Sequence, residues 1–360
     1  MRIGIDVSQI VYQTGVSRYT AKLVEYLLKV DKKNDYVLYG GSLRQRRMLK
    51  AFAANLPRKV KLVLTPLSPK LADIALNRLN LPLKQWLGNL DVFHASNWAL
   101  PNLDCSIVTT IHDLSFLKYQ DEHLPYYVAA HSRHLKRAKA KAAAVIAVSQ
   151  STKSDLVSVG FNGKNIKVIY EAADSLFKPV SSNLAKTKYQ LTDPYILSVG
   201  TLEPRKNLNR LIEAFTLLNQ KNLKLAIVGK FGWGEKTKPV AGVKLLGFVP
   251  DTDLAGLYSS AKAFVYPSLY EGFGLPVLEA LSCGCPVVTS DVSSLPEVAG
   301  KAAVYVNPKS VENIGKGIKE AFKQAGSLRL AGLTQAKKFS WEKTARETLK
   351  VYREVYANRH

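Results

Sequence analysis

Short apolar runs rich in β-branched residues alternate with segments of helical length along nearly the whole chain. Buried runs that are separated by helices are typical of parallel sheets with right-handed crossovers. This alternation of apolar runs and helical segments begins again after a polar stretch between Pro179 and Pro194. The chain of 360 residues is also longer than one hydrophobic core usually serves. The sequence therefore predicts an α/β protein with two doubly wound, Rossmann-like domains that face each other across a cleft.

The two predicted domains carry strands at a similar spacing. In the first, over residues 1–173, strands are expected at 2–7, 35–40, 59–65, 91–95, 106–113 and 143–149. In the second, over residues 174–340, they are expected at 195–200, 223–229, 243–249, 263–268 and 286–290. Ligands of such folds bind in a crevice beyond the C-terminal ends of the strands, so residues at those ends are the first candidates for a site.

Composition excludes some classes of function and leaves others open. The formal net charge of +23 is spread over both halves of the chain, which suits a nucleic acid, an anionic membrane face, a phosphorylated substrate or simply a well-solvated surface. No zinc-finger, homeodomain or RNA-recognition motif accompanies the charge, so no nucleic-acid partner is expected. The longest apolar run, Ala142–Val148, is too short to span a bilayer, and three cysteines without zinc spacing suit a reducing compartment.

The stretch 268–290 carries the pattern that says most about chemistry. Glu271 and Glu279 flank two glycines and Pro276, directly after an expected strand. Pro276 fits the first helical position, and the free N–H groups of a helix that begins there would suit a diphosphate. Glu279, one turn into the helix, is then placed to accept ribose hydroxyls, and Glu271 to accept hydroxyls of a second sugar. The backbone amides expected beside the sugar and diphosphate belong to Phe273, Gly274 and Leu275.

Either acid alone is typical of an ordinary surface or first-turn residue, and only the joint spacing of Glu271 and Glu279 favours a ligand site.

Other candidate site residues follow other strands. Arg205 and Lys206 come after the strand that ends at Gly200, where two cations could neutralise a diphosphate leaving group in place of a metal. Gly15 lies between the first strand and the first helix, where backbone can approach substrate phosphates without a side chain. No metal site is expected.

The motif Glu271-Gly-Phe-Gly-Leu-Pro-Val-Leu-Glu279 resembles the E-x7-E motif of the family-4 retaining glycosyltransferases. The likeness extends over essentially the whole chain. Residues 198–215 resemble the first strand, loop and helix of that family's C-terminal domain, residues 147–156 the end of its N-terminal domain, and residues 339–352 its terminal helix. One departure is Glu171-Ala172 in the interdomain connection, where many relatives carry Asn-Gly; we expect it to affect hinge geometry more than chemistry.

The resemblance implies the GT-B fold and a retaining transfer that needs no metal or other cofactor. It implies that Arg205 and Lys206 neutralise the departing diphosphate and that His112, at the end of the 106–113 strand, contacts the donor sugar. Asp113 is left with two possible roles, to orient that imidazole or to meet the acceptor. The family's proposed route is front-face attack, in which the departing phosphate takes the acceptor proton. Residues 341–360 are expected to pack back onto the first domain.

The pattern is most similar to bacterial polysaccharide mannosyltransferases. This implies GDP-mannose as the nucleotide-sugar donor and a hydroxyl of a glycan or polyprenyl-linked glycan as the acceptor. The basic first domain suggests a cytoplasmic protein that is peripheral on the inner face of an anionic membrane. The alternatives are the same fold with a UDP-sugar donor and a non-catalytic basic protein that binds membrane or nucleic acid. A dinucleotide-dependent oxidoreductase is disfavoured, because no G-x-G-x-x-G follows the first strand.

Overall fold

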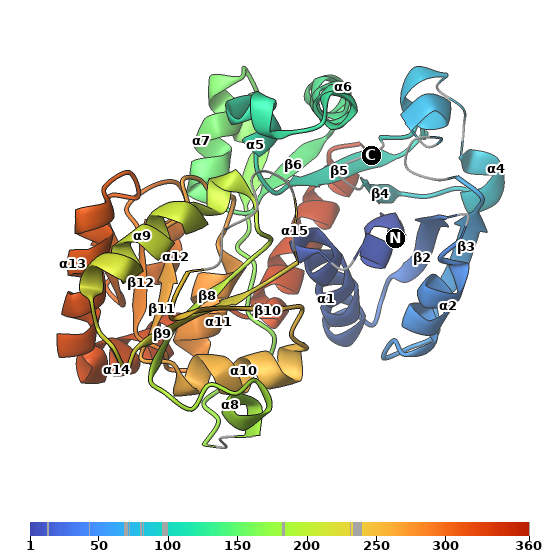
Figure 1. Ribbon diagram of the computed structural model, residues 1–360. Coiled ribbons are helices and arrows are strands. Elements are labelled where there is room, and N and C mark those ends of the chain that lie inside the picture. The colour runs from blue at the N-terminus through green and yellow to red at the C-terminus, as the bar shows by residue number, and fades with distance from the viewer. Residues whose placement is uncertain are drawn as a thin grey trace. The chain divides into compact units, whose positions relative to one another are not determined.

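The computed structural model describes residues 1–359 except Gln13, Leu43, 68–70, Ala72, Asn80, Pro82, 96–99, 182–183, Phe231 and 233–239. The chain forms two compact units (Figure 1). The first comprises Met1–Glu171 together with Trp341–His360, and the second comprises Ala172–Ser340. The first unit thus ends two residues before the boundary expected from the sequence.

In the described part of the first unit, seven strands form one parallel sheet in the order β3-β2-β1-β4-β5-β6-β7. They are β1 (Arg2–Asp6), β2 (Asp35–Gly41), β3 (Lys61–Thr65), β4 (Val92–Ala95), β5 (Ser106–Ile111), β6 (Ala144–Ala147) and β7 (Ile166–Val168). The first six confirm the strands expected in this half of the chain. The short edge strand β7 was read from the sequence as part of the connection between the domains.

Helices flank this sheet (Figure 1). They are α1 (Gly15–Val30), α2 (Arg46–Ala54), α4 (Lys84–Leu87), α5 (Ser115–Lys118), α6 (Pro125–Lys141) and α7 (Gln150–Ser158), with the short turns η1 (Ser8–Tyr12), η2 (Asp73–Arg78), η3 (Gln120–Glu122) and η4 (Gly163–Asn165). All six residues of β5 are buried, as a strand covered on both faces requires. Helix α1 places Leu23, Leu27 and Leu28 in the interior at 2% exposure or less.

The second unit is a parallel sheet of six described strands in the order β10-β9-β8-β11-β12-β13. They are β8 (Tyr195–Val199), β9 (Lys224–Val228), β10 (Val243–Gly247), β11 (Ala263–Tyr266), β12 (Val287–Ser290) and β13 (Ala303–Val306). The helices are α8 (Leu184–Lys188), η5 (Pro204–Lys206), α9 (Leu208–Leu218), α10 (Asp251–Ser260), α11 (Leu275–Ser282), α12 (Leu295–Ala299), α13 (Val311–Lys323) and α14 (Ala325–Ala336). Both units are therefore the doubly wound α/β type that the sequence predicted.

Strand order reverses once in each sheet, between β1 and β4 in the first unit and between β8 and β11 in the second. At such a point successive connections leave toward opposite faces, and a crevice opens beyond the C-terminal ends of the two strands. The segments after β1, β8 and β11 carry Gly15, Arg205 with Lys206, and Glu271, respectively. The fold therefore places most of the predicted residues at the two positions where this architecture binds ligands.

The last helix, α15 (Trp341–Ala357), belongs to the first unit and packs against α1 (Figure 1). Its residues Trp341, Ala345, Leu349 and Tyr352, which share one face at helical spacing, are buried. The hydroxyl of Tyr352 lies 2.6 Å from Nδ1 of His94 on β4. The C-terminal helix is thus part of the first unit's core.

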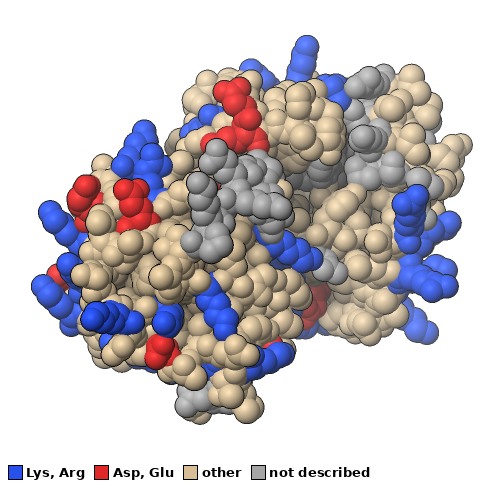
Figure 2. All heavy atoms as spheres, in the orientation of Figure 1, with Lys and Arg blue, Asp and Glu red and all other residues tan. Residues whose placement is uncertain are grey.

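Lys and Arg side chains are spread over the face shown in Figure 2, with few Asp and Glu among them. The net charge of +23 therefore does not gather into a single patch on this face. In the part of the chain that the structure describes, no helix has the length and apolar character to cross a membrane.

Candidate active site

Four charged side chains meet beyond the C-terminal ends of the neighbouring strands β8 and β11. Glu203, Arg205 and Lys206 lie on the segment after β8, and Glu271 lies on the segment after β11. Their side chains are nearly buried, at 6%, 13%, 11% and 9% exposure in that order. The structure thus brings Arg205, Lys206 and Glu271 into contact and adds Glu203. We call these four residues the charge cluster.

Glu271 is held by three donors. Nζ of Lys206 donates to its Oε1 at 2.6 Å, the Tyr266 hydroxyl donates to the same oxygen at 2.8 Å, and Nη1 of Arg205 lies 3.0 Å from Oε2. Burial by itself would raise the pKa of Glu271, but the charges of Arg205 and Lys206 lower it to about 2. Glu271 is therefore an ionised hydrogen-bond acceptor at any physiological pH.

The two cations are held by further contacts. Nη2 of Arg205 donates to Glu203 at 2.5 Å and Nη1 to the carbonyl of Tyr270 at 2.6 Å, while Nζ of Lys206 also donates to the Tyr266 hydroxyl at 2.7 Å. Burial, and then the neighbouring guanidinium, lowers the pKa of Lys206. With two cations and two carboxylates the charge cluster is neutral as a whole, which reduces the cost of burying four charges.

Asn207 fixes the segment that carries the two cations. It adopts a left-handed conformation with φ of 60°, which Asn tolerates better than most residues. Its side-chain Nδ2 donates to the carbonyls of Pro267 and Pro308 at 2.9 and 2.6 Å, and the Leu269 N–H donates to the Arg205 carbonyl at 2.9 Å. The segments after β8 and β11 are thereby joined through their backbones, which sets the geometry of the charge cluster.

Helix α11 begins at Leu275, one residue earlier than expected, with Pro276 in its first turn. Gly274 precedes it with φ of 104°, and a Cβ there would lie 2.9 Å from Cδ2 of Leu295, so the position requires glycine. The Ser294 hydroxyl donates to the carbonyls of Glu271 and Phe273 at 3.0 and 2.8 Å. The Ser294 side chain therefore fixes the turn between Glu271 and helix α11.

Glu279 and Gly200 lie in the same unit. Glu279 is 3% exposed and accepts a hydrogen bond of 3.2 Å from the Tyr258 hydroxyl of α10. Gly200 follows β8, and its carbonyl oxygen lies only 1.8 Å from where a Cβ on Gly229 would stand. The tight approach of these two strand ends is what keeps Gly229 without a side chain.

Gly15 is the first residue of α1, in the first unit. The Thr14 side chain accepts from Ser17 N–H and the Ser17 hydroxyl accepts from Thr14 N–H, so the helix start is closed by a capping box. A Cβ on Gly15 would meet nothing within 4 Å. The protein itself therefore gives no steric reason for glycine at this position.

His112 follows β5 in the first unit. Its Nδ1 lies 3.0 Å from Oε1 of Glu171, and its ring meets that of Tyr19 edge to face with centroids 4.7 Å apart. Asp113 was expected either to orient this imidazole or to meet the acceptor, but its Oδ1 accepts the Ser115 N–H at 2.8 Å, at the start of α5. The carboxylate that contacts His112 is instead Glu171, which the sequence had indicated only as a difference in the connection.

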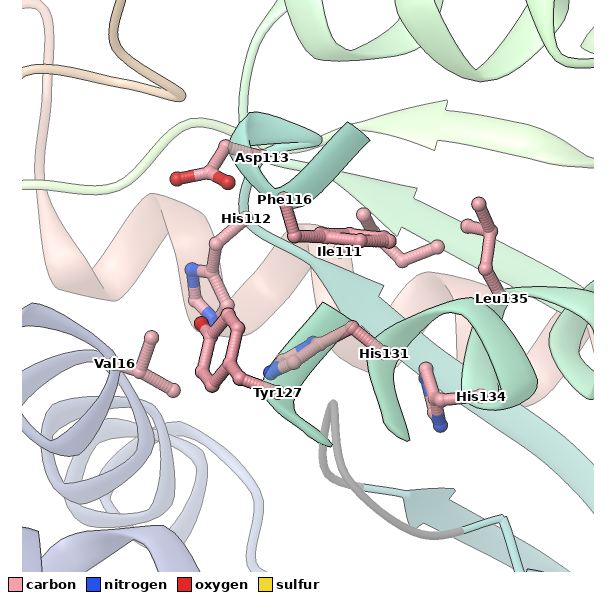
Figure 3. Close-up of a pocket in the computed structure, with 9 residues that line it drawn as sticks. All are labelled: Val16, Ile111, His112, Asp113, Phe116, Tyr127, His131, His134 and Leu135. Atoms are coloured by element: carbon pink, nitrogen blue, oxygen red, sulfur yellow. The ribbon is translucent and has the colours of Figure 1, made fainter. Parts of the chain in front are cut away.

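A pocket of about 60 Å³ lies beside His112 (Figure 3). His112 and Asp113 line it from the end of β5, and Tyr127, His131 and His134 line it from α6. Burial lowers the pKa of His131 to about 4 and that of His134 to about 3, so both rings are neutral. Tyr127 lines this pocket, while Tyr126 is half exposed.

Four residues of these sites were missed by sequence reasoning: Glu203, Asn207, Tyr266 and Glu171. Glu203 carried a usable signal, because an acid beside two cations at a strand end predicts an ion pair. Asn207 acts through hydrogen bonds to backbone carbonyls, and Tyr266 acts through its hydroxyl. Glu171 contacts His112, which lies 59 positions away in the sequence. Contacts of that kind depend on the tertiary fold, so spacing along the chain does not reveal them.

Within the described ranges of the chain, no group of three or more His, Cys, Asp or Glu side chains is arranged to hold a metal ion. An Asp-x-Asp pair, Asp251 and Asp253, opens helix α10. Oδ2 of Asp253 accepts from Lys188 at 2.6 Å and from the Tyr189 hydroxyl at 2.9 Å, which links α10 to the segment around α8.

Comparison with known proteins gives consistent matches over the whole chain. Residues 13–175 match the family model described as Glycosyltransferase Family 4, and residues 181–339 match the one described as Glycosyl transferases group 1. The chain is 32% identical to O-antigen chain mannosyltransferase B of Escherichia coli, over 94% of this chain and 96% of that protein.

One further relative and one solved structure are similar to this chain, the latter in fold. A serotype-specific mannosyltransferase of Escherichia coli, WbdA, is 31% identical over 68% of this chain, which corresponds to 33% of that longer protein. The solved structure of a sucrose-phosphate synthase from Thermosynechococcus elongatus superposes with a TM-score of 0.76 at 20% identity, covering 99% of this chain and 100% of that one.

Proposed function

The chain belongs to the family-4 glycosyltransferases, which have the GT-B fold, and is thus a hexosyltransferase; from this premise we propose that it is a retaining, metal-independent mannosyltransferase. In this proposal it moves mannose from GDP-mannose to a hydroxyl of a glycan or lipid-linked glycan. The mannose donor is supported by similarity to relatives that are named as mannosyltransferases. The acceptor class is supported by the first of these, which is named for the O-antigen chain.

The observation that carries the mechanism is the buried charge cluster at the strand-order reversal of the second unit. Arg205 and Lys206 would bind the diphosphate of the donor together with the backbone amides at the start of α11, with Gly200 and Leu275 beside it. Negative charge grows on the diphosphate as the glycosidic bond breaks, and preorganised cations stabilise that charge most in a site with little water. No metal is needed for this task.

The two glutamates would bind hydroxyls of the donor. Glu271, kept ionised by its neighbours, is an acceptor for hydroxyls of the transferred sugar, and Glu279 for hydroxyls of the ribose. Both oxygens of Glu271 already contact cations or the Tyr266 hydroxyl, and a carboxylate with a pKa of about 2 is a weak nucleophile. We therefore assign Glu271 to binding and not to a covalent glycosyl intermediate.

The transfer itself would follow front-face attack. The bond between the anomeric carbon and the diphosphate oxygen breaks, the acceptor oxygen bonds to the same face of that carbon, and the acceptor proton passes to the departing phosphate. His112 would contact the donor sugar near the anomeric carbon. The protein then mainly positions the substrates and excludes water.

Donor profiling of the purified protein tests this proposal. Thermal shift with GDP, UDP and ADP reports the base, and transfer from GDP-mannose to a lipid-linked glycan extract, with and without EDTA, reports activity and metal dependence. We expect stabilisation by GDP, transfer unaffected by EDTA, and an α-linked product, since GDP-mannose is an α-donor. Stabilisation by UDP alone would favour the alternative UDP-sugar donor, and a β-linked product would overturn the retaining mechanism.

We also propose that the protein acts at the cytoplasmic face of an anionic membrane, through its basic first domain. Leu124 and Tyr126, at the start of the basic helix α6, are 63% and 50% exposed. Such a combination of exposed apolar and basic residues suits a lipid headgroup region. Co-sedimentation with vesicles of phosphatidylglycerol, compared with phosphatidylcholine alone, tests it; equal recovery with both lipids would contradict an anionic surface.

A further inference from the structure

Glu171 is the last residue of the first unit and is buried, at 4% exposure. Its Oε1 lies 3.0 Å from Nδ1 of His112, and the two side chains are 5% and 15% exposed. A carboxylate placed against one ring nitrogen of a histidine normally accepts a hydrogen bond from that nitrogen's N–H group and so fixes the tautomer. This contact joins residues on two elements that are far apart in the sequence.

The segment that carries Glu171 is anchored in the first unit. The Ile169 N–H donates to the Ala147 carbonyl at 3.0 Å, at the end of β6. The Thr344 hydroxyl of α15 donates to the carbonyl of Tyr170 at 2.7 Å. Both contacts lie within two residues of Glu171, so the backbone that precedes Glu171 is fixed to the first unit.

The backbone and the ring of His112 are each held by a further contact. The Thr152 hydroxyl donates to the His112 carbonyl at 3.2 Å, and Thr152 is itself bonded to Ser149 at the start of α7. The edge-to-face contact with Tyr19 restrains the ring plane. With Nδ1 engaged by Glu171, the other nitrogen, Nε2, is the one left to a ligand, and His112 lines the pocket shown in Figure 3.

We propose that Glu171 is a positioning residue that keeps the proton of the His112 imidazole on Nδ1, so that Nε2 presents its lone pair to a hydroxyl of the bound sugar or acceptor. This inference rests on the proposed function for the identity of the ligand. It gives the Glu171-Ala172 departure a chemical consequence beyond hinge geometry.

The tautomer of His112 can be tested by a measurement that does not depend on enzyme activity. The chain has 6 histidines, and ring-¹⁵N labelling with a His112→Asn variant assigns the His112 signals. In the neutral imidazole we expect Nδ1 protonated and Nε2 unprotonated in the wild type, and a mixture in Glu171→Ala. A His112 with its proton on Nε2 in the wild type would overturn the proposal.

Kinetics test the consequence. Removing a carboxylate that orients a metal-bound histidine typically costs about tenfold to hundredfold in activity, and we expect an effect of that order here. We expect Glu171→Ala to lower kcat of transfer by at least about tenfold while the Kd for free GDP stays within about twofold, because His112 contacts the sugar and not the nucleotide. Glu171→Gln, which can still accept from Nδ1–H, should fall between the wild type and Glu171→Ala.

The matched control is Glu354→Gln, the same chemical change in an exposed pair with Lys167 in the same unit, 3.0 Å apart. It should leave kcat and the tautomer unchanged. Wild-type kcat in Glu171→Ala, or an equal loss of kcat, GDP affinity and thermal stability, would overturn the positioning role. If the wild type transfers no sugar from any donor, the proposed function fails, while the ¹⁵N result still decides the Glu171–His112 pairing.

Discussion

The ammonium of Lys206 lies 2.6 Å from Oε1 of Glu271, and both groups are nearly buried. The Tyr266 hydroxyl joins them, since Lys206 donates to it at 2.7 Å and it donates to Glu271 at 2.8 Å. Lys206 has three N–H donors, of which the described contacts use two, so one is left for a ligand. In the proposed function the same pair would therefore serve both the stability of the second unit and the binding of a diphosphate.

Lys206→Ala should disable transfer. The variant lacks a cation that we place on the departing diphosphate, and losing one such preorganised donor costs about 10²–10³ in kcat. We expect a fall of that order in kcat/KM for the nucleotide sugar. Lys301→Ala, an exposed lysine of the same unit, is the control and should match the wild type. A folded Lys206→Ala protein with wild-type kcat/KM would remove Lys206 from the site.

The stability of the second unit should depend on the charge of Glu271. Its pKa is lowered to about 2 in the folded protein, so ionised Glu271 stabilises the fold above the pKa of an unfolded glutamate. That contribution, roughly 3 kcal/mol, is lost as pH falls through the interval from about 4.5 to about 2. Glu271→Gln should therefore unfold earlier than the wild type at pH 7, and the gap in Tm should shrink below pH 4.5.

A control for this titration is Glu342→Gln, which removes an exposed partner of Arg346 on α15. Exposed pairs of this kind contribute about 0.3–0.5 kcal/mol, so its Tm should stay close to that of the wild type at every pH. A gap between wild type and Glu271→Gln that is constant from pH 6 to pH 3 would show that the Glu271 charge does not stabilise the fold.

Gly15→Ala and Gly274→Ala should have opposite consequences. A Cβ on Gly15 has open space, and alanine is the better helix former, so this variant should keep or raise Tm. If substrate approaches the backbone there, its KM rises. A Cβ on Gly274 would clash with Leu295 at φ of 104°, so that variant should lose stability first. Measurements of Tm and KM on both variants separate the cases, and an unchanged KM in Gly15→Ala would argue against close substrate approach.

Much of the fold was open to sequence reasoning because it depends on local patterns. Each of the eleven expected strands appears in its sheet, since short β-branched runs between helices leave little choice but parallel pairing. Two edge strands were missed, β7 and β13. Only one residue of each, Ile166 and Val306, is buried, so their patterns resemble loops.

The site was predictable only in part. Arg205, Lys206 and Glu271 stood out because charged residues follow apolar runs, and their mutual contact then follows from the adjacency of β8 and β11. The orientation of His112 was not predictable, because the sequence suggests the neighbouring Asp113 as its partner, whereas the carboxylate that contacts it is Glu171, 59 positions away. Asp113 is nearer along the chain but is used by the Ser115 N–H at a helix start, which local pattern alone does not reveal.

Tyr352→Phe should destabilise the first unit through a single lost hydroxyl. That hydroxyl lies 2.6 Å from Nδ1 of His94, whose Nε2 lies 2.9 Å from Thr110 Oγ1, and burial lowers the pKa of His94 to about 3, so the ring is neutral. A buried Nδ1 left without its partner costs about 1–3 kcal/mol. Tyr26→Phe, on a half-buried ring that contacts Lys29, is the control and should change stability by less than about 0.5 kcal/mol. Unfolding by urea gives both free energies, and hydrogen exchange shows whether the loss includes the amides of α15, as its place in the first core requires. Equal stability of the two variants would mean that the hydroxyl of Tyr352 adds nothing to the packing of its helix.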